Sequence, residues 1–294
     1  MDKPFIAHLE DRGVVAVTGA DAVKFLNGLV TNEVAHLAEG EAAYAGLLSP
    51  QGKILFAFFA LRTADGFFLD VAREKAADLV KRLSLYKLRA AVTIADVSER
   101  FDVWVAKDES SIAKHIPNVA LSFRDPRHEA MGLRILSPRD AAASAAPSNG
   151  DVGAYVAQRI ALGVPEGGKD YEFGDTYPHE ADFDWFNGAS FAKGCYVGQE
   201  VVSRMKHKTV VRKRVVRITG ETNLKPGADI TIGTVVIGRT GSVDGVHGLA
   251  LLRLDRYAEA REAGQTVSAA DTPIQVCDED FTRYAETVAK REKA

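Results

Sequence analysis

The last third of the chain is a series of short β-branched runs separated by glycine, and this pattern restricts the fold more than any other feature. The runs occupy residues 210–219, 230–237, 241–246, 248–254 and 272–276. Segments this short cannot bury an apolar surface alone, whereas several of them joined by tight turns can close on one another. The pattern predicts a small antiparallel barrel or sandwich that begins near Thr209.

The first two thirds of the chain mix strand and helix periodicities. Strand-like runs occupy residues 13–17, 54–61, 67–71, 92–97 and 101–106, with a hairpin signal at Ala64-Asp65-Gly66. Helices are expected after Asp21 and over residues 73–86, 110–115 and 152–162. Residues 137–150, rich in Ala, Ser and Pro, are typical of a linker. An α+β protein follows, and 294 residues favour two or three domains.

Composition narrows the classes of function. The formal net charge of -3 gives no global field that would attract nucleic acid. No run reaches the roughly 18 apolar residues of a membrane span, and the first 13 residues resemble neither a signal peptide nor a transit peptide. With only two cysteines, we expect a soluble protein of the reducing cytoplasm that does not bind membranes.

The same two cysteines limit metal chemistry. Iron-sulfur clusters normally take about four thiolates, and the seven histidines are scattered along the chain. We therefore predict no resident metal site. A chain of this kind that handled an iron-sulfur cluster would have to share it with a partner or a second subunit.

Cys195 is the strongest candidate for chemistry. It directly follows Gly194 and stands before a helix-like run over residues 199–205. Helix amides, the helix dipole and the nearby Lys193 would together stabilise a thiolate at this position. The alternative is a small buried hydrophobe, which is how we interpret Cys277. The glycines around Cys195 favour the functional interpretation, because a packing cysteine needs no such backbone freedom.

The segment around Cys195 also carries a family signature. Residues 193–200, KGCYVGQE, match the K-G-C-[YF]-x-G-Q-E pattern of the YgfZ-type folate-binding proteins, which belong to the aminomethyltransferase (glycine cleavage T-protein) superfamily. Residues 25–32, FLNGLVTN, are similar to the family's F-L-x-G-x-x-T-N, and residues 178–182, PHEAD, to P-x-E-x-N. The resemblance covers residues 13–254 and is closest to the branch that includes the mitochondrial iron-sulfur assembly relative.

The resemblance implies a three-domain T-protein-like ring around a folate-sized hole, with a C-terminal antiparallel β-barrel. The first domain would be discontinuous, comprising residues 1–45 and 145–208, and would carry the KGCYVGQE motif. An inserted α+β, ferredoxin-like domain would occupy residues 46–144. The barrel would span residues 209–294.

The resemblance also implies a site for tetrahydrofolate or a derivative, and a transient iron-sulfur cluster is a further candidate. Cys195 would be the functional thiol, and the rest of its motif comprises Lys193, Gly194, Tyr196, Gly198, Gln199 and Glu200. Glu180 would hold the pterin, because a carboxylate can accept two parallel hydrogen bonds from the amino and ring N–H groups. Asn32 and Arg159 are further folate candidates, although Arg159 could equally be a structural helix residue.

The enzyme branch of the superfamily carries G-G-x-x-D-D near the start of a strand. Residues 52–57 of this chain read GKILFA, so that Phe56 and Ala57 replace both carboxylates. An apolar pair can neither bind an amine nor accept a proton. The resemblance therefore implies the fold without the classical aminomethyltransferase reaction.

A basic run follows the motif. Its members are Arg204, Lys206, Lys208, Arg212, Lys213, Arg214 and Arg217. Such a run is usually only a solvated face, and the functional alternative is a positive patch for a folate polyglutamate tail, an acidic partner or RNA. Because no RNA motif or interleaved aromatic residue accompanies it, direct nucleic-acid binding is disfavoured.

Together these features predict a folate-binding accessory factor for iron-sulfur cluster assembly or repair in client enzymes, including radical enzymes that modify tRNA. Its partners would be iron-sulfur assembly proteins and those clients, and Cys195 would be its essential group. The alternative is a tetrahydrofolate-dependent aminomethyl or methyl transferase. A third interpretation, an RNA-binding adaptor, depends on the basic run alone.

Overall fold

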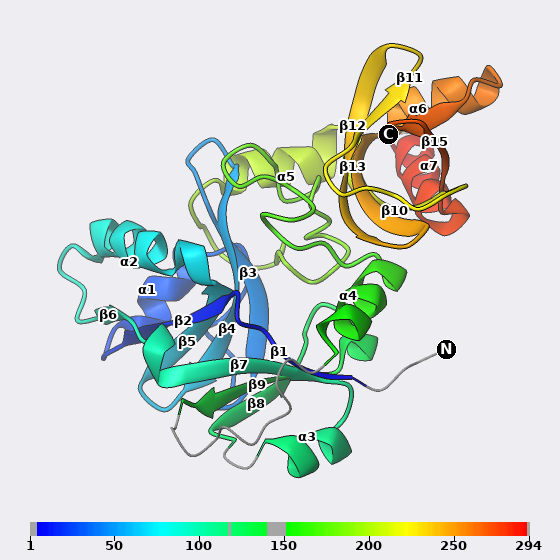
Figure 1. The fold of residues 1–294 in the computed structure, drawn as a ribbon. Helices are drawn as coiled ribbons and strands as arrows, with labels where there is room; N and C mark the ends of the chain where they lie inside the picture. The colour runs from blue at the N-terminus through cyan, green and yellow to red at the C-terminus, as the bar shows by residue number, and fades with distance from the viewer. Residues whose placement is uncertain (1–4, 117–118, 140–150, 293–294) are drawn as a thin grey trace. The chain divides into compact units, whose positions relative to one another are not determined.

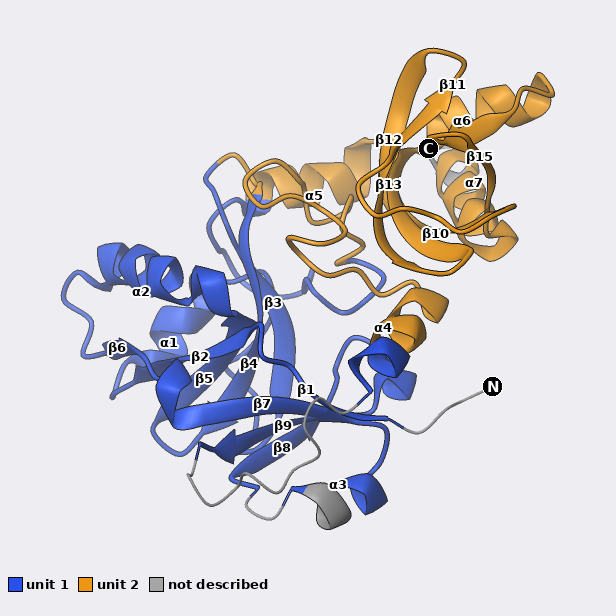
Figure 2. Cartoon of the chain, viewed as in Figure 1, with its two compact units in different colours: residues 1–50, 54–155, 184–199 blue, residues 51–53, 156–183, 200–294 orange. Residues whose placement is uncertain are grey.

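The computed structural model describes residues 5–116, 119–139 and 151–292 (Figure 1). The chain forms two compact units (Figure 2). Unit 1 comprises Met1–Pro50, Ile54–Tyr155 and Asp184–Gln199, and unit 2 comprises Gln51–Lys53, Val156–Phe183 and Glu200–Ala294. Each unit has a sheet-based hydrophobic core of its own.

The first sheet of unit 1 has five antiparallel strands in the order β3-β4-β5-β2-β6. They are β2 (Arg12–Thr18), β3 (Ala42–Leu48), β4 (Ile54–Thr63), β5 (Gly66–Ala72) and β6 (Thr93–Asp96). The predicted hairpin is confirmed, since β4 and β5 pair directly up to Thr63 and Gly66. Gly66 has a φ of 151°, and a Cβ there would lie 2.1 Å from the carbonyl oxygen of Val17, so only glycine fits.

Two helices belong to this sheet, α1 (Ala22–Asn27) and α2 (Arg73–Lys87). The predicted helix over residues 73–86 is confirmed, and its buried residues Ala76, Leu79 and Leu83 join the core of the five-stranded sheet. β2 pairs with β5 on one side and β6 on the other, so a strand from the start of the chain lies inside a sheet of later strands. The division into three domains stays a prediction.

The second sheet of unit 1 has four antiparallel strands in the order β1-β7-β9-β8. They are β1 (Ile6–His8), β7 (Phe101–Ala106), β8 (Leu121–Arg124) and β9 (Leu133–Pro138), accompanied by α3 (Glu109–His115) and the 3-10 turns Ser98–Arg100 and Glu129–Met131. The predicted linker over residues 137–150 begins too early, because Ser137 and Pro138 pair with β7. Its residues from 140 onward lie outside the described residues.

Asp70 joins the two sheets of unit 1. This buried carboxylate on β5 accepts hydrogen bonds from Arg12 Nε on β2 at 2.6 Å and from Arg134 Nε on β9 at 2.7 Å. The guanidinium groups of Arg12, Arg127 and Arg134 lie 4.2 to 5.9 Å from the centroid of the Phe59 ring. Paired charges stacked on an aromatic face can be buried without an uncompensated desolvation penalty.

Unit 2 contains a closed barrel with the strand order β10-β13-β12-β11-β14-β15, which confirms the predicted C-terminal antiparallel barrel. Its strands are β10 (Lys213–Gly220), β11 (Asp229–Ile232), β12 (Val235–Asp244), β13 (His247–Arg253), β14 (Val267–Ala269) and β15 (Thr272–Val276). Helices α6 (Leu254–Glu262) and α7 (Asp278–Glu292) pack on the barrel through Tyr257 and Tyr284. Two more helices, α4 (Val152–Ala161) and α5 (Gln199–Lys208), complete the chain.

No helix within the described residues is both long enough and apolar enough to cross a membrane.

Candidate functional site

Cys195 lies on an exposed turn before α5. Gly198, three residues later, has a φ of 81°, which is the left-handed conformation that the glycine was expected to provide. Neither the backbone conformation nor the space at position 194 requires glycine. The φ of Gly194 is ordinary, and a Cβ there would meet no described atom within 4 Å. Position 194 therefore leaves room for a side chain next to the exposed Cys195.

Lys193 fixes one side of the turn. Its buried ammonium donates hydrogen bonds to the carbonyl oxygens of Asn27 at 2.7 Å, Val30 at 2.7 Å and Asn32 at 2.8 Å. An ammonium has three N–H groups, so none is left for the Cys195 sulfur. The side chain closes the segment that follows α1, and its electrostatic stabilisation of a Cys195 thiolate stays a prediction. Burial lowers the pKa of Lys193 to about 8.

Tyr196 and Val197 fix the other side. Tyr196 is 7% exposed, and burial raises the pKa of its phenol to about 12. Val197 packs against the core of the five-stranded sheet. The motif thus holds two exposed residues, Gly194 and Cys195, between side chains that point into unit 1.

The last two motif residues belong to the start of α5. Gln199 Nε2 lies 3.4 Å from the carbonyl oxygen of Gly194, a long hydrogen bond across the turn. Glu200 is exposed and forms an ion pair at 2.8 Å with Arg204, one helical turn later. Such a pair supports the helix by only a few tenths of a kcal/mol, roughly 0.3 to 0.5. The geometry gives Glu200 a helix-stabilising contact.

The side chain of Asn32 forms hydrogen bonds to backbone groups of unit 1. Its amide donates to the carbonyl oxygens of Tyr44 at 2.9 Å and Asn187 at 2.6 Å, and its oxygen accepts from the Glu33 amide. Both amide N–H groups are therefore used within the protein. Any role of Asn32 toward folate, which stays a prediction, would act by positioning the segment that contains Asn187.

Thr31 was missed by the sequence analysis. Its buried hydroxyl donates to the carbonyl oxygen of Gly188 at 2.6 Å and accepts from the Gly46 amide at 2.8 Å. Ser190 donates its amide to the carbonyl oxygen of Thr31 at 2.9 Å. The T-N pair of residues 31 and 32 thus ties the segment before the Cys195 turn to β3. Only the family pattern F-L-x-G-x-x-T-N hinted at this.

Glu180 is half-buried in unit 2. Its Oε2 accepts from the Tyr177 amide at 2.8 Å and closes a turn, while within the described residues Oε1 has no protein partner. Lys53 was also missed: its ammonium lies 3.6 Å from the centroid of the Tyr177 ring and donates to the carbonyl oxygen of Asp175. A carboxylate oxygen, an aromatic face and a cation thus come together around Tyr177.

Arg159 lies in a buried ion-pair cluster of unit 2. Its guanidinium donates to Asp170, to the carbonyl oxygen of Val164 at 2.8 Å and to the Ser242 hydroxyl on β12. The side chain is 0% exposed. This arrangement supports the structural alternative for Arg159, because the side chain joins the end of α4 to the barrel.

Several members of the basic run have partners inside unit 2. Arg214 is buried against Asp182 at 2.8 Å, and Arg217 is paired with Asp280 and Glu279. Arg204 is paired with Glu200. Three of the seven cations of the run are therefore paired with carboxylates, and RNA binding stays an untested alternative.

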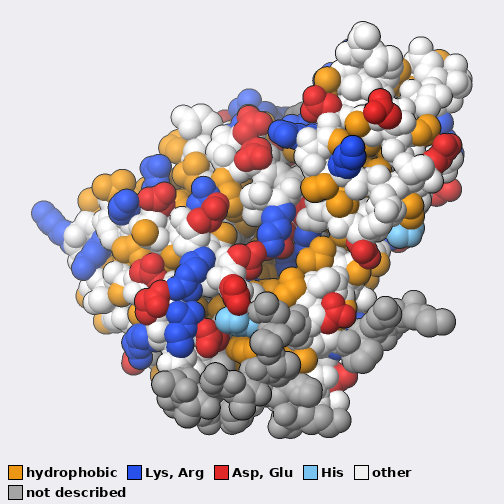
Figure 3. Space-filling model, in the orientation of Figure 1, with side chains coloured by type: hydrophobic (Ala, Val, Ile, Leu, Met, Phe, Trp, Pro, Cys, Tyr) orange, Lys and Arg blue, Asp and Glu red, His pale blue; other side chains and the backbone are white. Residues whose placement is uncertain are grey.

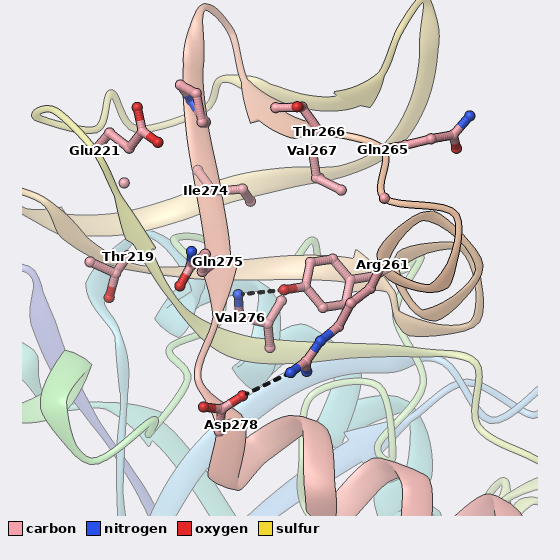
Figure 4. A pocket seen from close by; sticks show the side chains of 14 residues that line it. Thr219, Glu221, Arg261, Gln265, Thr266, Val267, Ile274, Gln275, Val276 and Asp278 are labelled. Carbon is pink, nitrogen blue, oxygen red and sulfur yellow. Dashed lines mark hydrogen bonds and ion pairs between the residues drawn. The ribbon is translucent and has the colours of Figure 1, made fainter.

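A pocket of about 650 Å³ lies in the barrel unit between α6, β15 and the end of β10 (Figure 4). Arg261 and Asp278 pair across it at 3.5 Å, and the Tyr257 hydroxyl accepts from the Val276 amide at 3.1 Å. None of the predicted site residues lines it. Across the part of the chain that the structure describes, no three His, Cys, Asp or Glu side chains converge as metal ligands.

Two family models match the chain. The GCVT N-terminal domain matches residues 6–105, and the CAF17 C-terminal beta-barrel domain matches residues 212–284. The fold is that of the T-protein class: a glycine cleavage system aminomethyltransferase T from Bartonella henselae superposes with a TM-score of 0.70 at 16% identity, covering 92% of this chain and 84% of that one.

Similar curated proteins define the family more narrowly than the two domain models do. The mitochondrial iron-sulfur cluster assembly factor IBA57 of Homo sapiens is 33% identical over 298 residues, covering 90% of this chain and 83% of the relative. Its Mus musculus counterpart is 33% identical, covering 83% and 76%. A Mycosarcoma maydis homologue is 37% identical, covering 73% of this chain and 57% of that protein. The chain belongs to the IBA57 family of the aminomethyltransferase-like proteins.

These relatives correct the predicted location. Each of them is named as a mitochondrial protein, whereas the sequence analysis placed this chain in the cytoplasm. The cytoplasmic prediction rested on the small number of cysteines and on the first 13 residues. A reducing compartment is not unique to the cytoplasm, so cysteine content could not distinguish the two locations.

Proposed function

We propose that this chain is a folate-binding accessory factor for the assembly or repair of iron-sulfur clusters in client enzymes. The observation that carries the proposal is the exposed Cys195 thiol, held between the buried side chains of Lys193 and Tyr196 in a member of the IBA57 family. An exposed thiol between two buried side chains suits contact with a partner protein better than a packing role.

The iron-sulfur cluster would be cargo. Cys195 can supply one thiolate, and the described residues offer no converging set that would complete a cluster site. Clusters normally need about four ligands. The remaining ligands would therefore come from an iron-sulfur assembly protein or from the client enzyme, including radical enzymes that modify tRNA.

The residues around Glu180 fit a reduced folate. Oε1 is open to a ligand while Oε2 holds the turn, and each carboxylate oxygen has two lone pairs. The carboxylate would accept hydrogen bonds from the pterin amino and ring N–H groups, and the Lys53 ammonium beside Tyr177 adds a positive charge to the same place. When bound, folate would supply one-carbon chemistry or serve as a regulatory ligand.

The finer assignment to the YgfZ-type branch is also part of the proposal, and it rests on the KGCYVGQE string. The transferase alternative has little support. Phe56 and Ala57, which stand where the enzyme branch has carboxylates, are buried in β4 at 6% and 8% exposure. We propose that the chain has no aminomethyltransferase activity, and turnover of an aminomethyl donor with tetrahydrofolate would contradict this.

The thiol is tested by complementation of a deletion strain with Cys195→Ser, using Cys277→Ser as the matched control. We expect Cys195→Ser to be folded and to leave iron-sulfur enzyme activities low, while Cys277→Ser restores them. Full restoration of the iron-sulfur enzyme activities by Cys195→Ser would mean that the KGCYVGQE motif is structural. Folate binding would then be the only part of the proposed function left.

Folate binding is tested by calorimetry with 5-formyltetrahydrofolate and two variants. Glu180→Gln keeps an acceptor for the Tyr177 amide but removes the charge, whereas Glu180→Ala removes both. We expect both to weaken binding by about 1 to 3 kcal/mol, with only Glu180→Ala lowering stability. Unchanged affinity in both would remove Glu180 from the site.

A further inference from the structure

The end of α2 presents two leucines to solvent. Leu85 is 71% exposed and Leu88, which follows the last helical residue, is 89% exposed. They are among the most exposed large apolar side chains in the described part of the chain. Exposed apolar side chains that lie close together mark contact surfaces more often than single ones do.

Leu88 also has an unfavourable backbone conformation. Its φ is 44° and its ψ is -106°, a combination that side chains other than glycine rarely adopt. The turn is fixed on both sides: Tyr86 and Ala90 pack against the core, and the Ala91 amide donates to Asp21 at 2.7 Å. Backbone strain that persists in a well-fixed turn, around an exposed apolar side chain, is typical of a functional position.

The leucines are surrounded by positive charge. Residues 79–92 contain four cationic side chains and no acidic one, although the whole chain has more acidic than basic residues. Within the described residues, Lys81 is paired with Asp78 at 3.2 Å, and no ion pair is formed by Arg82, Lys87 or Arg89. In Figure 3, Lys and Arg side chains gather along the left edge, where Figure 1 places α2 and the turn after it.

We propose that this surface, which we call the α2 tip (Lys81, Arg82, Leu85, Lys87, Leu88 and Arg89), docks a protein partner that presents acidic residues around an apolar pocket for Leu88. Unpaired cations attract and orient an acidic partner, and a few residues buried at the centre of an interface supply most of its affinity. The surface uses neither Cys195 nor Glu180, so it stands independently of the proposed function.

A membrane is a poorer occupant. Helices that lie in a membrane interface insert a continuous apolar face, and in α2 that face is used by the core through Ala76, Leu79 and Leu83. Nucleic acid is also disfavoured, since exposed aliphatic leucines would gain nothing from phosphates. The combination of two leucines with four cations favours an acidic protein.

The partner is identified by expressing variants of the whole chain in cells and crosslinking them to the proteins that they contact. In one variant, photoreactive benzoylphenylalanine replaces Ser84, an exposed residue next to Leu85 of the α2 tip. In the control variant it replaces Ala77, which is exposed earlier on the same helix. We expect one protein adduct from position 84, through an Asp- and Glu-rich peptide, and none from position 77. No adduct, equal adducts, or an adduct to lipid, nucleic acid or a second copy of this chain would overturn the proposal.

The energetics are tested with the purified partner. Leu88→Asn removes the exposed apolar side chain and should weaken binding by about tenfold or more. Lys87→Glu with Arg89→Glu should weaken it similarly, and rising salt should weaken the unmodified complex. Val235→Asn, at an exposed valine of the barrel, is the control and should change nothing. Unchanged affinity in Leu88→Asn would overturn the proposal.

Discussion

Lys193 Nζ lies 2.7 Å from the carbonyl oxygen of Val30, a residue 163 positions earlier in the chain. This contact ties the KGCYVGQE turn to the segment after α1, so that two of the three family patterns, KGCYVGQE and FLNGLVTN, are in contact. It also explains why a lysine precedes the exposed thiol: the ammonium donates to three carbonyl groups at the end of α1 and just after it.

Replacing Lys193 with methionine should lower the free energy of unfolding by about 1 to 3 kcal/mol at neutral pH, because three buried carbonyl groups lose their donor. Urea unfolding measures this. Lys24→Met, at an exposed position, is the matched control and should stay within about 0.5 kcal/mol of the unmodified chain. A Lys193→Met protein as stable as the control would contradict the anchoring role.

The same lysine predicts a pH dependence. Burial lowers the pKa of Lys193 to about 8 from an ordinary 10.5. Between these values the unfolded chain holds a proton that the folded chain has lost, so this group makes stability rise with pH above about 8. Below that pH both states are protonated and its contribution is flat. The stability difference between the unmodified chain and Lys193→Met should therefore widen above pH 8, and a difference that narrows would refute the assignment.

Cys195 should react with iodoacetamide faster than Cys277, by about tenfold or more, because it is exposed whereas Cys277 is half-buried at the end of β15. Peptide mass spectrometry of briefly alkylated protein gives both rates from one sample. Equal rates in the native protein, with a difference only after unfolding, would show that the turn does not present the thiol as described.

Thr31→Val should cost about 2 kcal/mol, because the methyl group can replace neither the donor to Gly188 nor the acceptor for Gly46. The Gly46 amide should also exchange its hydrogen faster, which hydrogen-exchange mass spectrometry detects. Thr234→Val, in an exposed turn of the barrel, is the control. Loss of stability without faster exchange near Gly46 would point to a packing effect.

Arg159→Met should destabilise the protein by about 3 to 5 kcal/mol, because Asp170 would be left buried without its ion-pair partner. Adding Asp170→Asn should recover part of the loss. If Arg159 instead served mainly as a folate contact, the single variant would lose folate affinity while its urea midpoint stayed unchanged.

Local sequence patterns were sufficient for elements whose signals are contiguous. The helical period of residues 73–86, the Ala64-Asp65-Gly66 turn and the barrel class were predicted from such patterns. Two barrel runs were placed wrongly: the run 230–237 includes the turn between β11 and β12, and the run 241–246 is the end of β12 and the turn after it. Short or atypical elements were not found. β1 has three residues, too few for any period, and α6 begins at Leu254 directly after β13 with no glycine or proline to mark the change.

The site was predicted less completely, since its contacts join distant segments. The position of Cys195 and the left-handed Gly198 followed from local chemistry, whereas the direction of Lys193 did not. Nothing in the spacing of residues 31 and 193 indicates that both secure the same turn. Arg159 shows the same limit, because Asp170 and Ser242 meet it only once unit 2 has folded.

Closure of the barrel has a consequence during translation. β15 is the last barrel strand to be synthesised, and it pairs with β10, the first. Ribosomes add about 5 to 20 residues per second, so the β10 edge that β15 covers stays unpaired for seconds after it emerges. An unpaired strand edge recruits other strands. Nascent chains stalled before Thr272 should therefore depend on chaperones more than chains released after Val276.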